Sequence, residues 1–425
     1  MRSPIPDYLA EVLEEVRGDE RGDVADYIPE LARANPDLTA IALATVEGSV
    51  YCVGEAGREF SIQSMSKPFT YSLALGDQGF DDVAARIGVE PSGEAFNEIS
   101  LEAGTGRPLN PMINAGAIAA HSLVRASSTA ERDRRVLEHY SAFAGRELGV
   151  AEEVFESEQS TGHRNLGLGH LMKAFGIIDD DPVDVVNGYI RQCSVSVTVR
   201  DLAHMAATLA NAGVQPVTGE RVVRADVVRH VLSVMTSCGM YDAAGDWLTT
   251  VGIPAKSGVA GGIIGVLPGQ VGVAVFSPRL DVHGNSVRGI RVMERLSRDL
   301  GMHLMEATRP SRSAIRDHRV ESVRGEDVTV YELQGDLVFV STESLIRHAV
   351  ENPPSTRIVV FDLHRVDEIS DVARKMSAEA ARRMKLDGHR VVLVDPNGVL
   401  PSFDLGDGTT PEYSSSIADI DVSPR

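Results

Sequence analysis

A serine and a lysine three residues apart are the first pattern in this chain that could do chemistry. Ser64 and Lys67 lie in the run Phe60-Ser-Ile-Gln-Ser-Met-Ser-Lys-Pro-Phe69. Pro68 suits the first turn of a helix, and the apolar residues that follow predict that this helix is buried. The spacing of three then places Ser64 and Lys67 on one helix face, about one turn apart.

This spacing suits an activated serine nucleophile. A serine hydroxyl attacks well when a neighbouring base takes its proton, and a lysine can be that base when burial or a nearby cation keeps it partly neutral. A helix terminus also favours negative charge that develops near the hydroxyl. Among the serines of this run, Ser64 alone has a lysine at plus three. The spacing arises by chance about once in such a chain, so a helix-capping serine and a solvated lysine are the plain alternative.

The composition is that of an ordinary globular protein with two or three domains. The 425 residues are 43% hydrophobic and 24% charged, and 41 basic against 61 acidic residues give a net charge of −20. Such an acidic chain is a poor partner for nucleic acid or an anionic membrane. The three distant cysteines predict reduced thiols in a cytoplasm rather than disulfides or zinc, and no histidine spacing is typical of a metal site.

Apolar periodicity predicts one helix near the N-terminus, strands, a long helical middle section, further strands and a closing helix. The expected ranges are 5–17, then 40–45 and 49–53, about 68–250, then 258–265 and 271–277, and finally 286–300. The apolar run 258–276 is interrupted by Leu267-Pro-Gly-Gln270, so we predict a β-hairpin and no membrane span. The N-terminus has no apolar signal core.

Strands on both sides of a helical block predict an α+β domain with one antiparallel sheet, a helical lobe and a site in the cleft between them. We expect this domain to cover residues 1–308. A polar segment with a proline predicts a linker over 309–319. After it, a strand–helix–strand–helix–strand pattern predicts a small α/β domain over 320–425, with a mobile tail from Ser402.

The late strand carries Lys256-Ser-Gly258, followed by Val259-Ala-Gly-Gly262. Glycines in a strand let another backbone or a ligand come close, although tight packing alone also explains them. With Ser64 at a helix N-terminus, this arrangement resembles serine acyl-transfer enzymes of the β-lactamase and penicillin-binding type. The resemblance implies an oxyanion hole made by the main-chain N–H groups of Ser64 and Val259.

Six segments together resemble the serine-dependent glutaminases, over about residues 23–300. They are Asp-Tyr-Ile-Pro around Tyr27, Gln-Ser-Met-Ser-Lys-Pro, Asn110-Pro-Met-Ile-Asn-Ala-Gly-Ala117, the pair Glu158 and Asn165, Ser237-Cys-Gly-Met-Tyr-Asp242 and Lys256-Ser-Gly-Val-Ala-Gly-Gly262. The resemblance implies a β-lactamase-like fold and hydrolysis of L-glutamine to L-glutamate and ammonia through an acyl ester on serine. It also implies that no cofactor is needed and that the protein is a homodimer or homotetramer.

The resemblance also implies roles for individual residues. Ser64 would be the nucleophile and Lys67 its base, while Tyr27 and Tyr241 would flank the serine and one of them would move protons with Lys67. A carboxylate at Glu158 suits the substrate ammonium, and asparagine amides can bind either the ammonium or the α-carboxylate. The residues implied to contact glutamine are Ser64, Asn114, Glu158, Asn165, Tyr189, Tyr241 and Val259.

The block from about Val320 resembles the STAS domain, the fold of anti-sigma-factor antagonists. The opening strands, Ile358-Val-Val-Phe-Asp362 and the helix beyond carry this resemblance. A phosphorylatable serine often begins that helix in the family, whereas here Ile369-Ser-Asp-Val372 places Asp371 at the start with Ser370 beside it. A phosphorylation switch and a constitutive protein- or nucleotide-binding role are therefore both open.

Two alternatives to a glutaminase are considered. A β-lactamase or peptidase could use the same framework, but the predicted cytoplasmic location and the lack of a Ser-Asp-Asn segment between the two lysine segments disfavour it. An inactive scaffold would act through the C-terminal domain alone.

Overall fold

The computed structural model describes residues 3–93, 99–306, 314–400, 402, 404–405 and 408–423. The chain divides into two compact units. The larger one comprises Leu9–Arg298 with Met302–Met305, and the smaller one contains the C-terminal residues from Glu306 onward with short segments at the start of the chain and at 299–301. Residues 309–313 of the expected linker lie outside the described residues. A strand already begins at Ile315, before the expected domain start at 320.

A five-stranded antiparallel sheet lies at the centre of the larger unit, in the order β2-β1-β8-β7-β6. Residues from both ends of the unit meet where Ala40 pairs with Phe276, as the sequence predicted. The strands are β1 (Ala40–Thr45), β2 (Val50–Gly54), β6 (Ala255–Gly258), β7 (Gly262–Leu267) and β8 (Val271–Phe276). The expected hairpin over 258–276 is thus formed by β7 and β8, although residues 259–261 are a turn and not part of the strand.

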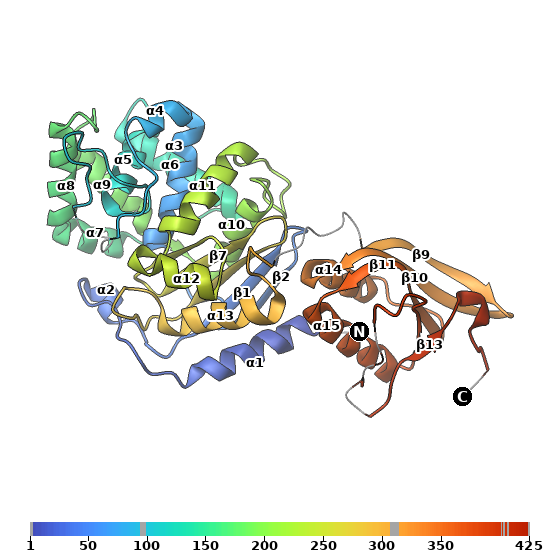
Figure 1. Cartoon of the computed structure of the whole chain (residues 1–425). Coiled ribbons are helices and arrows are strands. Elements are labelled where there is room, and N and C mark those ends of the chain that lie inside the picture. Colours follow the sequence, from blue (N-terminus) through green and yellow to red (C-terminus); the bar gives the residue numbers. More distant parts are fainter. Residues whose placement is uncertain are drawn as a thin grey trace. The chain divides into compact units, whose positions relative to one another are not determined.

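Helices cover both faces of this sheet, which explains why β1, β7 and β8 are buried on both sides. On one face α10 (Val199–Ala210) comes so close to β8 that a Cβ on Gly272 would lie 2.2 Å from the N of Ala207. On the other face α13 (Val287–Leu300) packs on β7, where a Cβ on Gly265 would contact Met293 (Figure 1). The glycines therefore let these helices lie directly against the strands.

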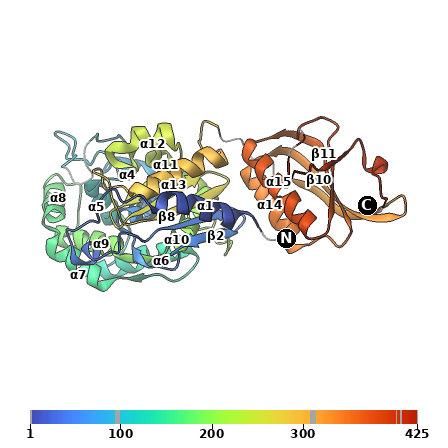
Figure 2. The same ribbon diagram turned by 90° about the horizontal axis from the view of Figure 1, so that it is seen from below.

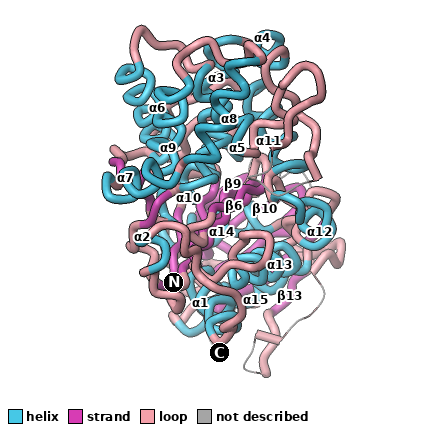
Figure 3. Tube along the Cα trace, turned by 90° about the vertical axis from the view of Figure 1, so that its left-hand side faces the viewer, coloured by secondary structure: helices cyan, strands magenta, loops and turns pink. Residues whose placement is uncertain are grey.

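The remaining helices of this unit form a lobe whose apolar core is continuous with buried residues of the sheet (Figure 3). They are α3 (Lys67–Gln78), α4 (Phe80–Ala84), α5 (Asn114–Ser122), α6 (Thr129–Ala144), α7 (Glu152–Thr161), α8 (His163–Ala174), α9 (Pro182–Cys193) and α11 (Ala225–Cys238). Shorter or peripheral elements are α1 (Ile5–Arg17), α2 (Pro29–Ala32) and α12 (Ala244–Thr250). Within the described residues, no helix has both the length and the apolar character needed to cross a membrane.

The smaller unit is a five-stranded sheet in the order β13-β12-β11-β10-β9, with α14 (Phe339–Glu351) and α15 (Asp371–Leu386) (Figure 2). Its strands are β9 (Ile315–Val323), β10 (Glu326–Leu337), β11 (Ile358–Ile369), β12 (Arg390–Val394) and β13 (Glu412–Ser414). Strands β10 to β13 pair in parallel, and β9 pairs antiparallel with β10. Strand β10 ends at Leu337, and α14 begins two residues later at Phe339.

Two details of the smaller unit bear on the expectations. Part of the tail expected to be mobile is packed on the unit, because β13 pairs with β12 and Ile420 lies in the valine-rich cluster on the sheet. Helix α15 begins at Asp371, as expected, and Ser370 beside it is the cap, since its hydroxyl accepts a hydrogen bond from the N of Ala373 at 3.3 Å. A serine therefore does stand at the start of this helix.

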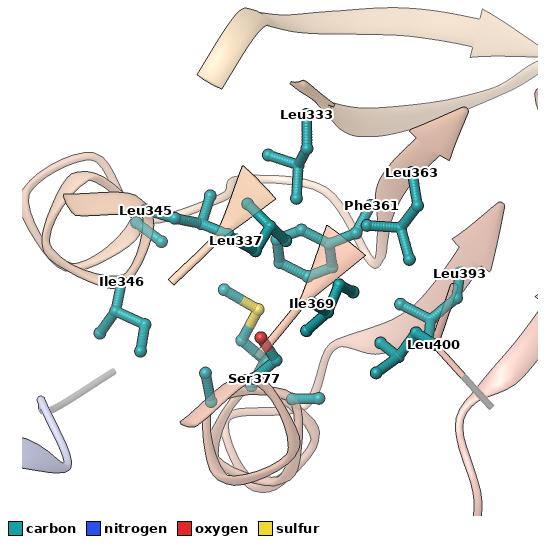
Figure 4. A pocket seen from close by; sticks show the side chains of 14 residues that line it. Leu333, Leu337, Leu345, Ile346, Phe361, Leu363, Ile369, Ser377, Leu393 and Leu400 are labelled. Atoms are coloured by element: carbon teal, nitrogen blue, oxygen red, sulfur yellow. The ribbon is translucent and has the colours of Figure 1, made fainter. Parts of the chain in front are cut away.

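An apolar cavity of about 40 Å³ lies between the sheet and the two helices of the smaller unit. Leucine and isoleucine side chains line most of it, with Phe361 on the strand side and the Ser377 hydroxyl on the α15 side (Figure 4). A void with an apolar lining stays dry, and the side chains around it lack van der Waals contacts on that side.

Candidate active site

Ser64 lies in η1 (Gln63–Ser66), a short 3-10 turn that runs directly into α3. Pro68 occupies the first turn of α3, as its position after Lys67 predicted. The turn is held from outside as well, because Phe60 pairs with Val197 and the N of Ile62 donates to Val195 in a small sheet of β3 (Phe60–Ser61), β4 (Gly149–Val150) and β5 (Val195–Val197). The end of α9, just before β5, is thereby brought behind the serine.

The backbone immediately before the serine is strained. Gln63 has a φ of +50°, in the left-handed region that residues with a side chain rarely adopt. Its side-chain amide donates to Ser61 Oγ and to Glu158 Oε1, each at 3.1 Å. These two hydrogen bonds hold Gln63 in place and present Ser64 to the adjoining cavity.

Strand β6, which carries Lys256-Ser-Gly258, lies against η1. A Cβ on Gly258 would lie 3.1 Å from the carbonyl O of Ile62 and 3.3 Å from Cβ of Gln63. The glycine therefore lets the strand approach the serine turn, as expected for this segment. Val259 follows directly and lines the same cavity as Ser64.

A cavity of about 320 Å³ opens beside Ser64. Seven of the residues singled out in the sequence line it: Tyr27, Ser64, Asn114, Glu158, Asn165, Tyr189 and Val259. They come from loops and helices that lie as much as 232 positions apart (27 to 259), so the fold brings the separate segments to one place. Lys67 and Tyr241 lie behind this lining.

Asn114, at the start of α5, is the centre of a hydrogen-bond network in the cavity wall. Its Oδ1 accepts from the amine of Lys67 at 2.7 Å and from the Tyr189 hydroxyl at 3.1 Å. Its Nδ2 donates to Oδ1 of Asn165, also at 3.1 Å. The asparagine thus links the buried lysine to two side chains that face the cavity.

Lys67 is fully buried, and its amine also donates to the carbonyl O of Met112 at 3.2 Å. Burial lowers the pKa of this amine to about 8, with the nearby Cys193 opposing the shift. Lys67 is therefore partly neutral near physiological pH, as a base requires. Within the described part of the chain, its amine makes no hydrogen bond to Ser64 Oγ.

The two tyrosines occupy different places. Tyr241, in η2 (Tyr241–Ala243), is buried with a φ of +57°, and its hydroxyl donates to the carbonyl O of Ser257 at 3.2 Å. Burial raises the pKa of this hydroxyl, and its interactions with the Ser64 side chain and with Ser257 oppose the shift. Tyr27 is 48% exposed, and its hydroxyl donates to Glu158 Oε1 at 2.8 Å. The Tyr241 hydroxyl therefore lies next to Ser64, whereas the Tyr27 hydroxyl lies next to Glu158 in the cavity wall.

The cavity is lined by charges of both signs. Burial raises the pKa of the Glu158 carboxyl, while hydrogen bonds from Tyr27 and Gln63 oppose the shift. Arg164, at the start of α8, lines the same cavity. A carboxylate and a guanidinium in one cavity are complementary to a ligand that carries an ammonium and a carboxylate.

Sequence reasoning did not single out Gln63, Arg164 or Cys193, although all three line the cavity. Gln63 is next to Ser64 and Arg164 is next to Asn165, so these neighbouring predicted residues could have indicated them. Cys193 ends α9 one turn after Tyr189, and no sequence pattern marks it. Within the described residues, no group of three or more His, Cys, Asp or Glu side chains is placed to hold a metal ion.

An α+β unit with a serine hydroxyl, a tyrosine and a buried lysine around one polar cavity is typical of enzymes that cleave acyl groups. Comparison with known proteins defines the family. The glutaminase family profile matches residues 22–305. The glutaminase of Corynebacterium efficiens is 49% identical over 408 residues, covering 96% of this chain and 96% of the relative. That of Trichormus variabilis is 52% identical over 307 residues, covering 72% of this chain and 92% of the relative.

Solved structures agree with this finding. The crystal structure of Mglu is 50% identical, with a TM-score of 0.71, and covers 94% of this chain and 100% of that one. A structure of Mglu in its glutamate form is 46% identical, with a TM-score of 0.71 and the same coverage. This chain belongs to the glutaminase family and hydrolyses L-glutamine to L-glutamate. The alternatives of a β-lactamase or peptidase and of an inactive scaffold are set aside by these matches.

Proposed function

We propose that this glutaminase works through a γ-glutamyl ester on Ser64, with Tyr241 passing protons between Ser64 and its surroundings. The observation that carries the proposal is the position of the buried Tyr241 hydroxyl, which donates to the carbonyl O of Ser257 and interacts with the Ser64 side chain behind the cavity. It favours Tyr241 over Tyr27 as the proton-moving tyrosine, because the Tyr27 hydroxyl is bound to Glu158.

In the first half-reaction, Ser64 Oγ bonds to the amide carbon of glutamine while its proton leaves through Tyr241. The C–N bond then breaks, and the leaving nitrogen takes a proton to depart as ammonia. In the second half-reaction, water adds to the ester carbon, releases glutamate and restores the Ser64 hydroxyl. The N–H groups of Ser64 and Val259 would bind the negative oxygen of both tetrahedral intermediates. Each lies next to the cavity, in the first turn of η1 and after β6.

Lys67 is the group that would accept and return protons during the reaction. Its lowered pKa lets it accept a proton near neutral pH, and its hydrogen bond to Asn114 links it to the substrate cavity. Catalytic hydrogen bonds are often long in the free enzyme and tighten with substrate bound. We propose that Lys67 acts on Ser64 in that complex, directly or through Tyr241.

The substrate would lie with its ammonium at Glu158 and its side-chain amide at Ser64. Glu158 offers the negative charge, and Tyr27 holds its carboxylate in place. The α-carboxylate would be bound by the amide groups of the cavity wall. The full set of proposed glutamine contacts is Ser64, Asn114, Glu158, Asn165, Tyr189, Tyr241 and Val259.

Replacing the nucleophile tests this function. Ser64→Ala is expected to abolish ammonia release from glutamine while the melting temperature stays within about 2 °C, because a small side chain beside a cavity contributes little to packing. Acid-quenched wild-type enzyme should carry a γ-glutamyl group on the peptide that contains Ser64. Ser160→Ala, on the exposed face of α7, is the matched control with normal activity. Turnover by Ser64→Ala would refute the proposal.

For the smaller unit, we propose a STAS-like module that binds a protein or a nucleotide. Its support is the largely parallel sheet with α14 and α15 on one face and the capping Ser370. The glutaminase of Trichormus variabilis matches only 72% of this chain, which supports a catalytic unit that works alone. Truncation at about residue 310 should therefore leave glutamine hydrolysis intact. We further propose a homodimer or homotetramer in the cytoplasm, which sedimentation and fractionation would test.

A further inference from the structure

Two histidines of the smaller unit face each other between a strand and a helix. His318 lies on β9, and His348 lies on α14. Nδ1 of His318 and Nε2 of His348 are 3.0 Å apart, and the rings meet edge to face with an angle of 86° between their planes. Both residues are partly exposed, so small ions in solution can reach the two facing nitrogens.

An aromatic row across the sheet holds the ring of His318. Tyr331 on β10 is the direct partner in register of His318 on one side and of Phe361 on the other. The Tyr331 ring stacks on the imidazole of His318, with 4.4 Å between centroids, and on Phe361 with 5.3 Å. His348 lies edge-on to the same tyrosine. The stacked rings therefore fix where Nδ1 of His318 lies before any ligand arrives.

The distance between the two nitrogens matches that of neighbouring ligands on one metal ion. Imidazole nitrogens bind first-row transition metals at about 2.0–2.1 Å. Two such bonds at a right angle place the nitrogens about 2.9 Å apart, whereas a tetrahedral angle places them about 3.4 Å apart. The observed 3.0 Å is close to the right-angled arrangement, which is typical of Cu²⁺ and Ni²⁺ rather than of Zn²⁺.

The protonation of the pair is compatible with such a ligand, since a histidine binds a metal in its neutral form. Burial, and then the charge of His348, lower the pKa of His318 below its usual value, with Asp317 opposing the shift. A neutral imidazole carries its proton on either nitrogen. With the protons on Nε2 of His318 and Nδ1 of His348, both facing nitrogens offer a lone pair.

We propose that His318 and His348 together bind a divalent transition-metal ion of the Cu²⁺ or Ni²⁺ type, with water in its remaining coordination positions. Within the described residues no third His, Cys, Asp or Glu side chain joins them, so we expect reversible binding, weaker than at a closed four-ligand site. Strand β9 is the edge of the sheet and pairs with β10. A bound ion would join this edge strand to α14 and so stabilise the smaller unit.

Titration of the tag-free, full-length protein with Ni²⁺ in a calorimeter tests this site. The wild type should bind one ion, and His318→Gln and His348→Gln should each weaken binding at least about tenfold, because the loss of even an outer partner of a metal ligand costs that much. His364→Gln, which replaces an exposed histidine on β11, is the matched control with unchanged affinity.

Two further measurements report the ligands and the effect of the ion. With Cu²⁺, the electron paramagnetic resonance spectrum of the wild type should show two nitrogen ligands, and that of either glutamine variant should not. At a Ni²⁺ concentration about 100 times the dissociation constant, the melting temperature of the smaller unit should rise by at least about 5 °C in the wild type and in His364→Gln.

Several results would overturn the inference. They are a wild type that binds no Ni²⁺, equal affinity in the wild type and both glutamine variants, or a Cu²⁺ spectrum with fewer than two nitrogens. If His318→Gln does not fold, His318→Phe, which keeps a ring stacked on Tyr331, takes its place in every measurement. A rise in melting temperature that is the same in His348→Gln as in the wild type would also refute the site, because the ion would then be bound elsewhere.

Discussion

Asn114→Asp is the substitution that probes the buried lysine most directly. It changes one amide to a carboxylate of nearly the same shape, 2.7 Å from the amine of Lys67. The new negative charge favours the protonated amine and therefore raises its pKa. An opposite charge at such a distance typically shifts a pKa by about 1 to 3 units.

The size of the effect follows from the starting pKa of about 8. A shift of about 2 units lowers the neutral fraction of Lys67 at pH 7 from roughly one in ten to roughly one in a thousand. If neutral Lys67 is the base, kcat at pH 7 should fall about 100-fold. Since the base acts when deprotonated, the loss should shrink as pH rises towards 10.

The assay is ammonia release at saturating glutamine from pH 6 to pH 10.5. Asn114 lines the substrate cavity, so Asn114→Asp is expected to change KM as well. Rates at saturating glutamine report kcat alone. Asn165→Asp is the control, because its carboxylate would lie one hydrogen bond farther from Lys67 and should shift the profile by less than about one unit. A uniform loss of kcat across the whole pH range in Asn114→Asp would refute Lys67 as the titrating base.

Three further predictions follow from the described contacts. Tyr27→Phe removes the hydrogen bond to Glu158 and should raise KM for glutamine about tenfold with little change in kcat. Tyr241→Phe should instead lower kcat about 100-fold. Initial-rate kinetics measure both constants, and the opposite pattern would exchange the roles of the two tyrosines. Burial lowers the pKa of His121 from 6.5 to about 4, so the neutral ring contributes stability that is complete above about pH 6.5 and is lost as pH falls towards 4, on the order of 3 kcal/mol. Urea unfolding of His121→Asn should show a shallower decline over this window than the wild type, and equal slopes would disprove the account. Ala380→Val should partly fill the cavity of the smaller unit and stabilise it by about 1 kcal/mol, and calorimetry would contradict this if that unit melted at a lower temperature.

The sequence predicted those elements of the catalytic unit in which the local apolar pattern agrees with burial in the fold. The strands that became β1, β2 and β8 are short apolar runs beside turn residues, and α1 has a clean apolar face, so local pattern and tertiary burial agree. The family resemblance placed seven residues that turned out to line one cavity, from Tyr27 to Val259. Their roles stay predictions until the variants are measured.

Other features depend on tertiary contacts that a single sequence does not reveal. Helix α7 buries Val154 alone among its residues, so apolar periodicity does not define its bounds. Helix α11 carries a regular set of buried valines, such as Val227 and Val231, and fits the helical section expected over 68–250. The polar composition of the tail predicts mobility, yet Ile420 is one of the side chains that cover the valine-rich sheet face.

The lysine contacts show the same limit at the site itself. A spacing of three placed Lys67 near Ser64, but the direction of its amine was decided by the acceptors that surround it, Met112 and Asn114. Likewise, the sequence left open which tyrosine serves the reaction, because only the folded chain shows Glu158 next to one and Ser64 next to the other.

The left-handed backbone at Gln63 and Tyr241 has a consequence for engineering. Glycine adopts this conformation without strain, but at Tyr241 the loss of a buried ring outweighs the strain relieved. At Gln63 glycine removes the side-chain hydrogen bonds to Ser61 and Glu158 that hold the serine turn. Directed evolution that relaxes this backbone therefore needs an activity readout at every round.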